Sequence, residues 1–345
     1  MELLYKIMIN YFRNLLIFLQ VKTRLSTELR AQRKCILSSL KIDINESKLT
    51  NDHSLDDFDF KKMTDYYGLA VPVMIGESFC KLKGKKMSLK ERLALTYLGG
   101  LTGLFDDFFD RKDMPENYIK NLLTQPREME GENSNEKLIL KFYLKSLRNS
   151  SNPERLTSYS LEIFNAQVLS KKQLSSDVSE DEIKDITFQK GGHSVLFYLC
   201  SFKEEISEPE KNLFYNLGGI WQIENDILDV YKDFKAGIKT MVTTETRINN
   251  LRTTYILQVD QLVNLVKQTD YPVSNKKRFL ESIILFISIG FVGLDVLEKN
   301  EKKTNNIFQL EKYERKGLIC DLEKPVNILK TIHYFLKYNP QIPLK

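Results

Sequence analysis

The chain has 345 residues, 42% of them hydrophobic, and a formal net charge of +5, so it is long and apolar enough to build a large core. Because 28% of the residues are charged and only 15 are glycine and 9 proline, the composition excludes a disordered or fibrous protein. The positive charge is mild and spread along the chain, and the basic run at 81–86 is interpreted as a solvated loop, so we expect no nucleic-acid partner.

Residues 1–20 are the first predicted element, an amphipathic N-terminal helix. Lys6 and Arg13 interrupt this segment and no small-residue cleavage site follows, which disfavours a signal peptide. The helix either packs on the body of the protein or makes peripheral contact with a membrane, and packing is the preferred alternative.

Helical periodicity continues along the whole chain, and the alternation typical of strands is scarce. A serine followed three residues later by glutamate predicts helix starts at Ser88, Ser179 and Ser207. No internal repeat or linker is apparent, so we expect residues 1–345 to form a single all-α domain, a helical bundle. Further helices are expected at about 17–38, 59–82, 134–148, 154–171, 246–268, 274–298 and 322–337.

Two features of the sequence bear on its compartment. The strongly apolar stretch at 282–294 is too short to span a bilayer and is typical of a buried helix. The cysteines lie far apart and form no CxxC pair, as expected of buried thiols in a reducing compartment. We therefore expect a cytoplasmic protein. Its cysteines are Cys35, Cys80, Cys200 and Cys320.

The stretch GLFDDFFDRKD, residues 103–113, places Asp106, Asp107 and Asp110 among large apolar side chains that include Phe105 and Phe109. Asp106 and Asp110 share one face of a helix, where like charges repel each other. The arrangement becomes favourable when divalent cations lie between the carboxylates, and such oxygen ligands suit Mg²⁺. The alternative is an acidic helix end at the protein surface.

The stretch WQIENDILDVYKD, residues 221–233, aligns a second set of oxygen ligands on a helix. Asn225, Asp229 and Asp233 are spaced four residues apart, with Gln222 one turn earlier and Asp226 beside the stripe. Two helices of this kind facing each other across a cavity would clamp a metal–diphosphate cluster.

Between these motifs, FQKGGHSVLF at 188–197 places Gly191 and Gly192 in a helical pattern. Each glycine costs about 1 kcal/mol relative to alanine in a helix, so the pair predicts a break or kink that exposes backbone carbonyls to a cavity.

Together these stretches resemble the two metal motifs of class I isoprenoid synthases, the superfamily of prenyl diphosphate synthases, terpene cyclases and squalene/phytoene synthases. DDFFD matches the first motif as it stands. NDILDVYKD is similar to the terpene-cyclase second motif, with Asp229 and Asp233 in place of the usual Ser/Thr and Glu. The same stretch is also similar to the second aspartate-rich motif of prenyl diphosphate synthases, through Gln222, Asp226, Asp229 and Asp233.

The resemblance implies the all-α fold of that superfamily, a linear prenyl diphosphate substrate (farnesyl, geranylgeranyl or longer) and a homodimer. It implies three Mg²⁺ ions, replaceable by Mn²⁺, held by the acidic residues of both motifs and Asn225. Lys190 matches a family lysine and would bind the diphosphate together with Lys239 and Arg315. The substrate pocket would be lined by Phe105, Phe109, Gln167, Gly191, Gly192, Phe197 and Gln222, and the aromatic residues among them are alternatively ordinary core.

Further motifs indicate which branch of the superfamily the chain resembles. Chain-elongating synthases carry an Arg-Arg pair after the first motif, whereas this chain has Arg111 and Lys112, and an upstream Gly-Lys-Arg site is poorly matched. Asn225 favours a cyclase, although the arginine that usually senses the diphosphate is missing between Arg155 and Arg247. We therefore expect an atypical terpene synthase. The alternatives are a chain-elongating or head-to-head prenyltransferase, and a non-catalytic helical partner protein.

Overall fold

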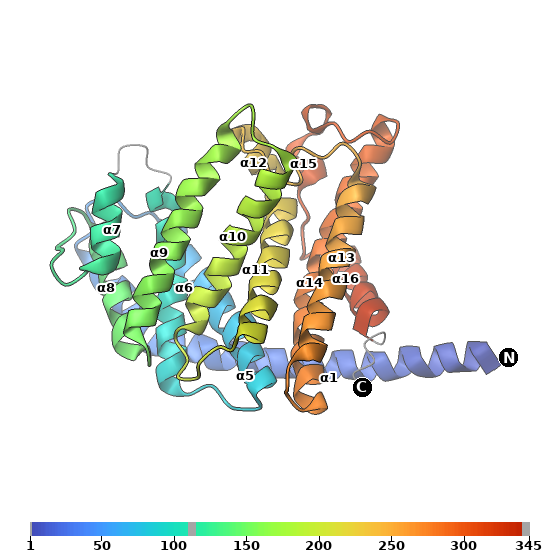
Figure 1. Cartoon of the computed structure of the whole chain (residues 1–345), viewed down its shortest axis with the longest axis horizontal. Helices are drawn as coiled ribbons and strands as arrows, with labels where there is room; N and C mark the ends of the chain where they lie inside the picture. Colours follow the sequence, from blue (N-terminus) through green and yellow to red (C-terminus); the bar gives the residue numbers. More distant parts are fainter. Residues whose placement is uncertain (1, 110–114, 340–345) are drawn as a thin grey trace. The chain divides into compact units, whose positions relative to one another are not determined.

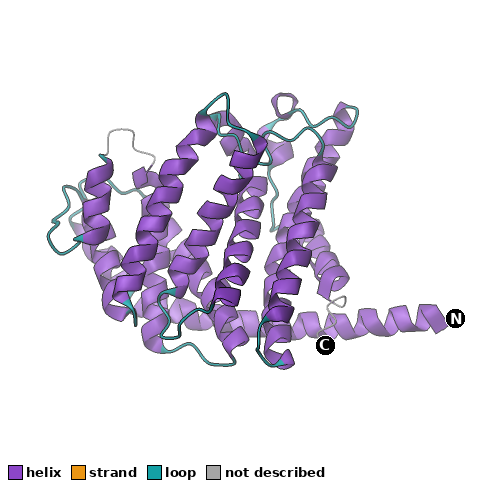
Figure 2. Cartoon of the chain, in the orientation of Figure 1, coloured by secondary structure: helices purple, strands orange, loops and turns teal. Residues whose placement is uncertain are grey.

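The computed structural model describes residues 2–109 and 115–339, without the side chains of residues 2–11 and 106–109. Every element in this part of the chain is a helix and none is a strand (Figure 1, Figure 2). The predicted all-α fold class is confirmed, whereas the isoprenoid synthase type of bundle stays a prediction. Asp110 lies outside the described residues, as do the side chains of Asp106, Asp107 and Phe109.

The helices group into two compact units. Unit 1 comprises residues 1–22, 168–195 and 207–345, and unit 2 comprises residues 23–167 and 196–206. That the whole chain forms one domain stays a prediction.

Unit 2 is built around the central helix α6 (Leu89–Phe109), which packs against α8 (Ser134–Asn149) and against η1 (Lys62–Tyr67). The run from Asp57 to Lys83 alternates between α-helical and π-helical turns, and Pro72 lies within one π-helical segment, where it cannot donate a backbone hydrogen bond. The other elements of this unit include α2 (Leu40–Leu49), α3 (Asp57–Lys61), α4 (Gly68–Ala70), η2 (Val71–Glu77), α5 (Ser78–Lys83), α7 (Glu116–Thr124) and most of α9 (Pro153–Ser170).

Unit 1 is built around α11 (Glu208–Leu228), which packs against α13 (Ile248–Gln268) and α14 (Val273–Glu301). α16 (Pro325–Tyr338) covers α14. Among the described residues, one helical stretch, Val273–Thr304, is long and apolar enough to cross a membrane, but 72% of its apolar window is buried, as in a core helix. The other elements are η3 (Lys171–Leu174), most of α10 (Glu180–Leu199), α12 (Val230–Ala236), η4 (Lys302–Thr304), η5 (Leu310–Lys312) and α15 (Arg315–Leu318).

The predicted helix starts are correct. At Ser88 and Ser207 the backbone amide donates to the glutamate three residues on, at 2.8 and 2.9 Å, and Ser179 makes the same bond at 3.0 Å. The first two predicted helices are one continuous helix of 37 residues, α1 (Glu2–Ser38), and α2 and α7 were not predicted. All four cysteines are free thiols; three are buried, as expected, and Cys320 is half-buried.

The central helices α6 and α11 carry equivalent positions, although no internal repeat was expected. Each starts after a serine of the capping box. Aligned from that serine, Gly99 and Gly100 correspond to Gly218 and Gly219. In the sequence, the same register aligns Asp107 with Asp226 and Asp110 with Asp229. Each unit therefore contains one helix with the same glycine pair followed by a matching aspartate, Asp107 in α6 and Asp226 in α11.

Candidate functional site

The second aspartate-rich motif lies at the junction of α11 and α12. Asp229 alone interrupts the helix, with φ −95° and ψ 8°. The i, i+4 hydrogen bonds continue across it, because the Asp229 amide donates to the Asn225 carbonyl at 2.8 Å and the Asp233 amide donates to the Asp229 carbonyl at 3.0 Å. The helix ends before Gly237, whose φ of +71° suits glycine. The helical spacing of these residues therefore continues across the junction, and their role as metal ligands stays a prediction.

Asp226 is the most buried carboxylate of this stripe, with 4% of its surface exposed. The Gln222 Nε2 group donates to its Oδ1 atom at 2.8 Å. Burial raises the pKa of Asp226 to about 7. The hydrogen bond from Gln222 and the positive charge of Lys190 lower this pKa, but by less than burial raises it. The negative charges of Asp233 and Asp229 raise it further.

The pKa of Asp233 is raised for similar reasons. Burial, with the charge of Asp229, raises the pKa of Asp233 to about 6, while Lys232 and Lys190 lower it. The charges of Asp229 and Asp233 act on Asp226, and that of Asp229 acts on Asp233, so the three carboxylates lie near one another. A cation bound beside them would favour their ionised form.

Lys190 reaches this cluster from α10, and the glycines that follow it have a different role from the one predicted. The prediction of a break at Gly191 and Gly192 is wrong, because α10 runs without interruption from Glu180 to Leu199. A Cβ atom on Gly191 would lie 2.0 Å from the Gly218 carbonyl oxygen, and one on Gly192 would lie 2.3 Å from the Tyr215 ring. The glycines let α10 and α11 approach closely, which brings Lys190 to the carboxylates.

The contact between these helices is reciprocal. A Cβ atom on Gly218 would lie 2.1 Å from the Gly191 carbonyl oxygen, and one on Gly219 would lie 2.3 Å from the Phe188 ring. In unit 2, Gly99 packs in the same manner, since its Cβ would lie 2.4 Å from the Tyr67 carbonyl oxygen. In both α6 and α11, the backbone of a glycine packs against the backbone of a neighbouring element, two turns before the aspartate that follows.

Asn225 does not belong to the buried cluster. It is exposed, whereas Asp226 is buried and Asp229 and Asp233 are half-buried. The structure thus brings together Lys190, Gln222 and the three aspartates. Asn225, the first ligand of the cyclase form, lies beside it on the solvent side.

The two other cations predicted to bind diphosphate lie in unit 1 as well. The Lys239 ammonium group donates to the Ser176 carbonyl at 2.6 Å, and the Lys239 backbone exchanges two hydrogen bonds with Gln173, each 2.9 Å long. Arg315 is exposed on α15, which lies next to α12 (Figure 1). The Lys239 ammonium group is thus bonded to a loop carbonyl, and Arg315 lies on a helix that packs against α12.

The remaining predicted pocket residues belong to unit 2. Phe105 and Phe197 are buried, with 9% and 6% of their surface exposed, and Gln167 is half-buried. The Phe197 ring contacts Tyr198, whose hydroxyl group pairs with that of Thr102 at 2.6 Å. Phe105 and Phe197 are core residues of their unit, and a role of these residues and Gln167 in substrate binding stays a prediction.

One carboxyl group was missed by the sequence analysis. Glu224 is 7% exposed, and burial raises its pKa to about 8, while a hydrogen bond from the Tyr255 hydroxyl at 3.5 Å lowers it. The same hydroxyl donates to the Ile287 carbonyl at 3.0 Å. In the sequence, the place of Glu224 between Ile223 and Ile227 in a helical pattern was the feature that could have indicated its burial.

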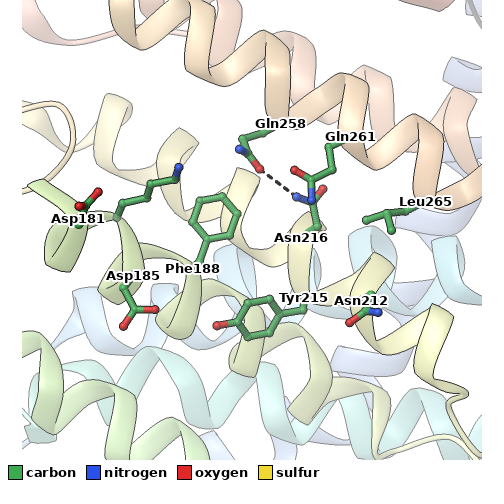
Figure 3. Close-up of a pocket in the computed structure, with 10 residues that line it drawn as sticks. Asp181, Asp185, Phe188, Asn212, Tyr215, Asn216, Gln258, Gln261 and Leu265 are labelled. Atoms are coloured by element: carbon green, nitrogen blue, oxygen red, sulfur yellow. Dashed lines mark hydrogen bonds between the residues drawn. The ribbon is translucent and has the colours of Figure 1, made fainter.

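Unit 1 also contains an open cavity of about 580 Å³ between α10, α11 and α13 (Figure 3). Four carboxamide side chains face it, and Asn216 donates to the Gln258 Oε1 atom at 3.0 Å. None of the residues predicted for the site lines it. Its lining is Asp181, Lys184, Asp185, Phe188, Asn212, Tyr215, Asn216, Gln258, Gln261 and Leu265.

The donor set of the stripe fits Mg²⁺, which commonly takes one or two carboxylates and completes its shell with water and phosphate oxygens. Among the residues whose side chains the structure describes, no group of three or more His, Cys, Asp or Glu side chains is placed to hold a metal ion by itself. An ion at Asp226 and its neighbours would thus rely on water or on a phosphate ligand. Comparisons with protein-family models, curated proteins and solved structures find no match to this chain.

Proposed function

We propose that this chain is a Mg²⁺-dependent terpene synthase that ionises a linear allylic prenyl diphosphate. The observation that carries the proposal is the cluster in unit 1, where a buried Asp226 with a raised pKa lies beside Gln222, Lys190 and two more aspartates. Carboxylates that repel one another in an apolar setting are costly unless cations share the site. In the sequence, the common register of α6 and α11 aligns Asp107 and Asp110 with Asp226 and Asp229.

In the proposed reaction the allylic C–O bond breaks, the diphosphate leaves with the electron pair, and an allylic carbocation remains. Bound Mg²⁺ supplies the positive charge that makes diphosphate a leaving group. Asp226, Asp229 and Asp233 would hold the metal, and Lys190 would add positive charge to the leaving oxygens. The cation then loses a proton or captures water after cyclisation, within an apolar pocket that excludes bulk water.

A second candidate is a prenyltransferase, in which the carbocation alkylates a second prenyl diphosphate. It is favoured by one observation: Asn225 is exposed, and the clustered residues are those of the prenyl diphosphate synthase motif. The first candidate is favoured by the lack of an Arg-Arg pair after the first motif.

The test is an incubation of the protein and Mg²⁺ with geranyl, farnesyl, geranylgeranyl and geranylfarnesyl diphosphate, each with and without isopentenyl diphosphate. Products are identified by mass spectrometry. We expect a hydrocarbon or alcohol from one allylic substrate alone, and a loss of at least about 100-fold in D226N and D107N. The matched control is E208Q, an exposed carboxylate on α11 that pairs with Lys211 and is expected to leave turnover unchanged.

The outcomes separate the candidates. A longer diphosphate formed only with isopentenyl diphosphate identifies a chain-elongating prenyltransferase. A coupled product from two allylic molecules identifies a head-to-head enzyme. No turnover of any substrate, by wild-type protein that binds neither Mg²⁺ nor diphosphate, contradicts the proposal and favours the non-catalytic partner.

A further inference from the structure

Among the residues of α1 from Phe12 on, whose side chains the structure describes, one face packs against α16. On this face, Asn14 and Val21 are buried, with 3% of their surface exposed, and the Phe18 ring meets the Phe335 ring of α16 at a centroid distance of 5.5 Å. This contact shows which side of α1 faces α16.

The opposite face carries a stripe of exposed apolar side chains. Phe12, Leu16 and Leu19 are 64%, 46% and 49% exposed and follow one another at i, i+4 and i+7. Surface apolar residues that occur singly are ordinary, but a stripe of three along one helix face marks an interaction surface. Figure 1 shows the N-terminal end of this helix extending past the end of α16.

Basic residues flank this stripe on both sides. At about 100° per residue, Arg13 falls about 100° to one side of Phe12 and Lys22 about 80° to the other, and both are exposed. Between Glu2 and Glu28 the sequence contains Lys6, Arg13, Lys22 and Arg24 and no acidic residue. An apolar stripe between basic edges is the pattern of a helix that lies in a membrane interface.

We propose that this face of α1 binds the surface of an anionic bilayer, with Phe12, Leu16 and Leu19 inserted and Arg13 and Lys22 at the headgroups. A second copy of this chain fits less well, because a twofold interface sets the same surface against itself and would bring the basic edges together. Anionic lipid headgroups supply the opposite charge along the whole helix. The inference rests on α1 alone and does not depend on the proposed catalytic function.

The test is sedimentation of the full chain with vesicles of phosphatidylcholine alone or mixed in equal parts with phosphatidylglycerol. We expect binding to the anionic vesicles that weakens with added salt. R13Q/K22Q should weaken it about 25-fold, since each basic residue near the surface contributes about fivefold. F12S/L16S should abolish it, whereas the matched control L89S, which removes a leucine that is 70% exposed in unit 2, should leave it unchanged.

Circular dichroism and light scattering provide further tests of the proposal. Circular dichroism should show unaltered helix content in each variant, because all the substituted residues are exposed. Wild-type protein that fails to bind anionic vesicles, or binding that F12S/L16S retains, overturns the proposal. A dimer in light scattering that F12S/L16S converts to a monomer, without vesicle binding by the wild type, assigns the surface to a second copy instead.

Discussion

Asp226 is a proposed Mg²⁺ ligand, and its burial makes the ionised carboxylate destabilising for the folded protein. Its pKa of about 7 lies above the ordinary aspartate value of 3.8, so between these values the folded state holds a proton that the unfolded state has lost. Stability contributed by this group is therefore complete at low pH and is lost as the pH rises toward 7. At pH 8 the ionised carboxylate opposes folding unless a cation is bound.

The first prediction concerns this residue. D226N removes the charge and retains a group that can pair with Gln222, so we expect a higher melting temperature than wild type at pH 8 without Mg²⁺, by about 4 °C or more. Adding Mg²⁺ should stabilise the wild type and leave D226N unaffected. Differential scanning calorimetry measures both, and a lower melting temperature for D226N would contradict the assigned burial cost.

The second prediction concerns Glu224. This residue is buried but is not a proposed metal ligand, so its substitution tests the effect of burial alone. Its pKa of about 8 predicts that stability falls as the pH rises from about 4.5 to about 8, in the same sense as for Asp226. E224Q keeps the neighbourhood of Tyr255 but carries no charge, so its free energy of unfolding at pH 8 should exceed that of wild type by about 2 kcal/mol or more. Urea titrations at pH 5 and pH 8 measure the difference, which should vanish near pH 5.

At the scale of elements, the crossing of α10 and α11 determines where Lys190 lies. In G191A, the added Cβ would need to move away from a carbonyl oxygen 2.0 Å distant, and backbone cannot yield as a flexible side chain does. We expect G191A to lose about 3 kcal/mol of stability or more, because the helices must separate. K184A, at an exposed position of the same helix, should change stability by less than about 0.5 kcal/mol. Equal stability of the two variants in urea would refute the close crossing.

The same crossing explains what sequence reasoning could and could not reach. The capping serines were predictable, because Ser88 and Ser207 act through bonds to residues three positions away. The role of Gly191 was not, because it depends on Gly218, which is distant in sequence. A glycine pair in a helix has two explanations, a break or a close neighbour, and only the tertiary contact distinguishes them.

At the scale of the whole molecule, the choice between Asn225 and Asp226 shows the same limit. Both positions fit a ligand stripe by spacing alone, and the burial of Asp226 follows from how α11 packs among its neighbours. The correspondence between α6 and α11 was not predictable from the sequence, because the identical residues are few and scattered, and it depends on the matching capping serines at the two helix starts. The all-α class, by contrast, followed from periodicity throughout the chain.

The central claim is that the acidic residues of α11 and α12 hold Mg²⁺ with a diphosphate. The most direct measurement is a calorimetric titration of inorganic diphosphate into the protein, with and without Mg²⁺, for wild type, D226N and E208Q. We predict saturable binding that requires Mg²⁺, is lost in D226N and is retained in E208Q. Binding that persists without Mg²⁺, or that D226N leaves intact, would contradict the account.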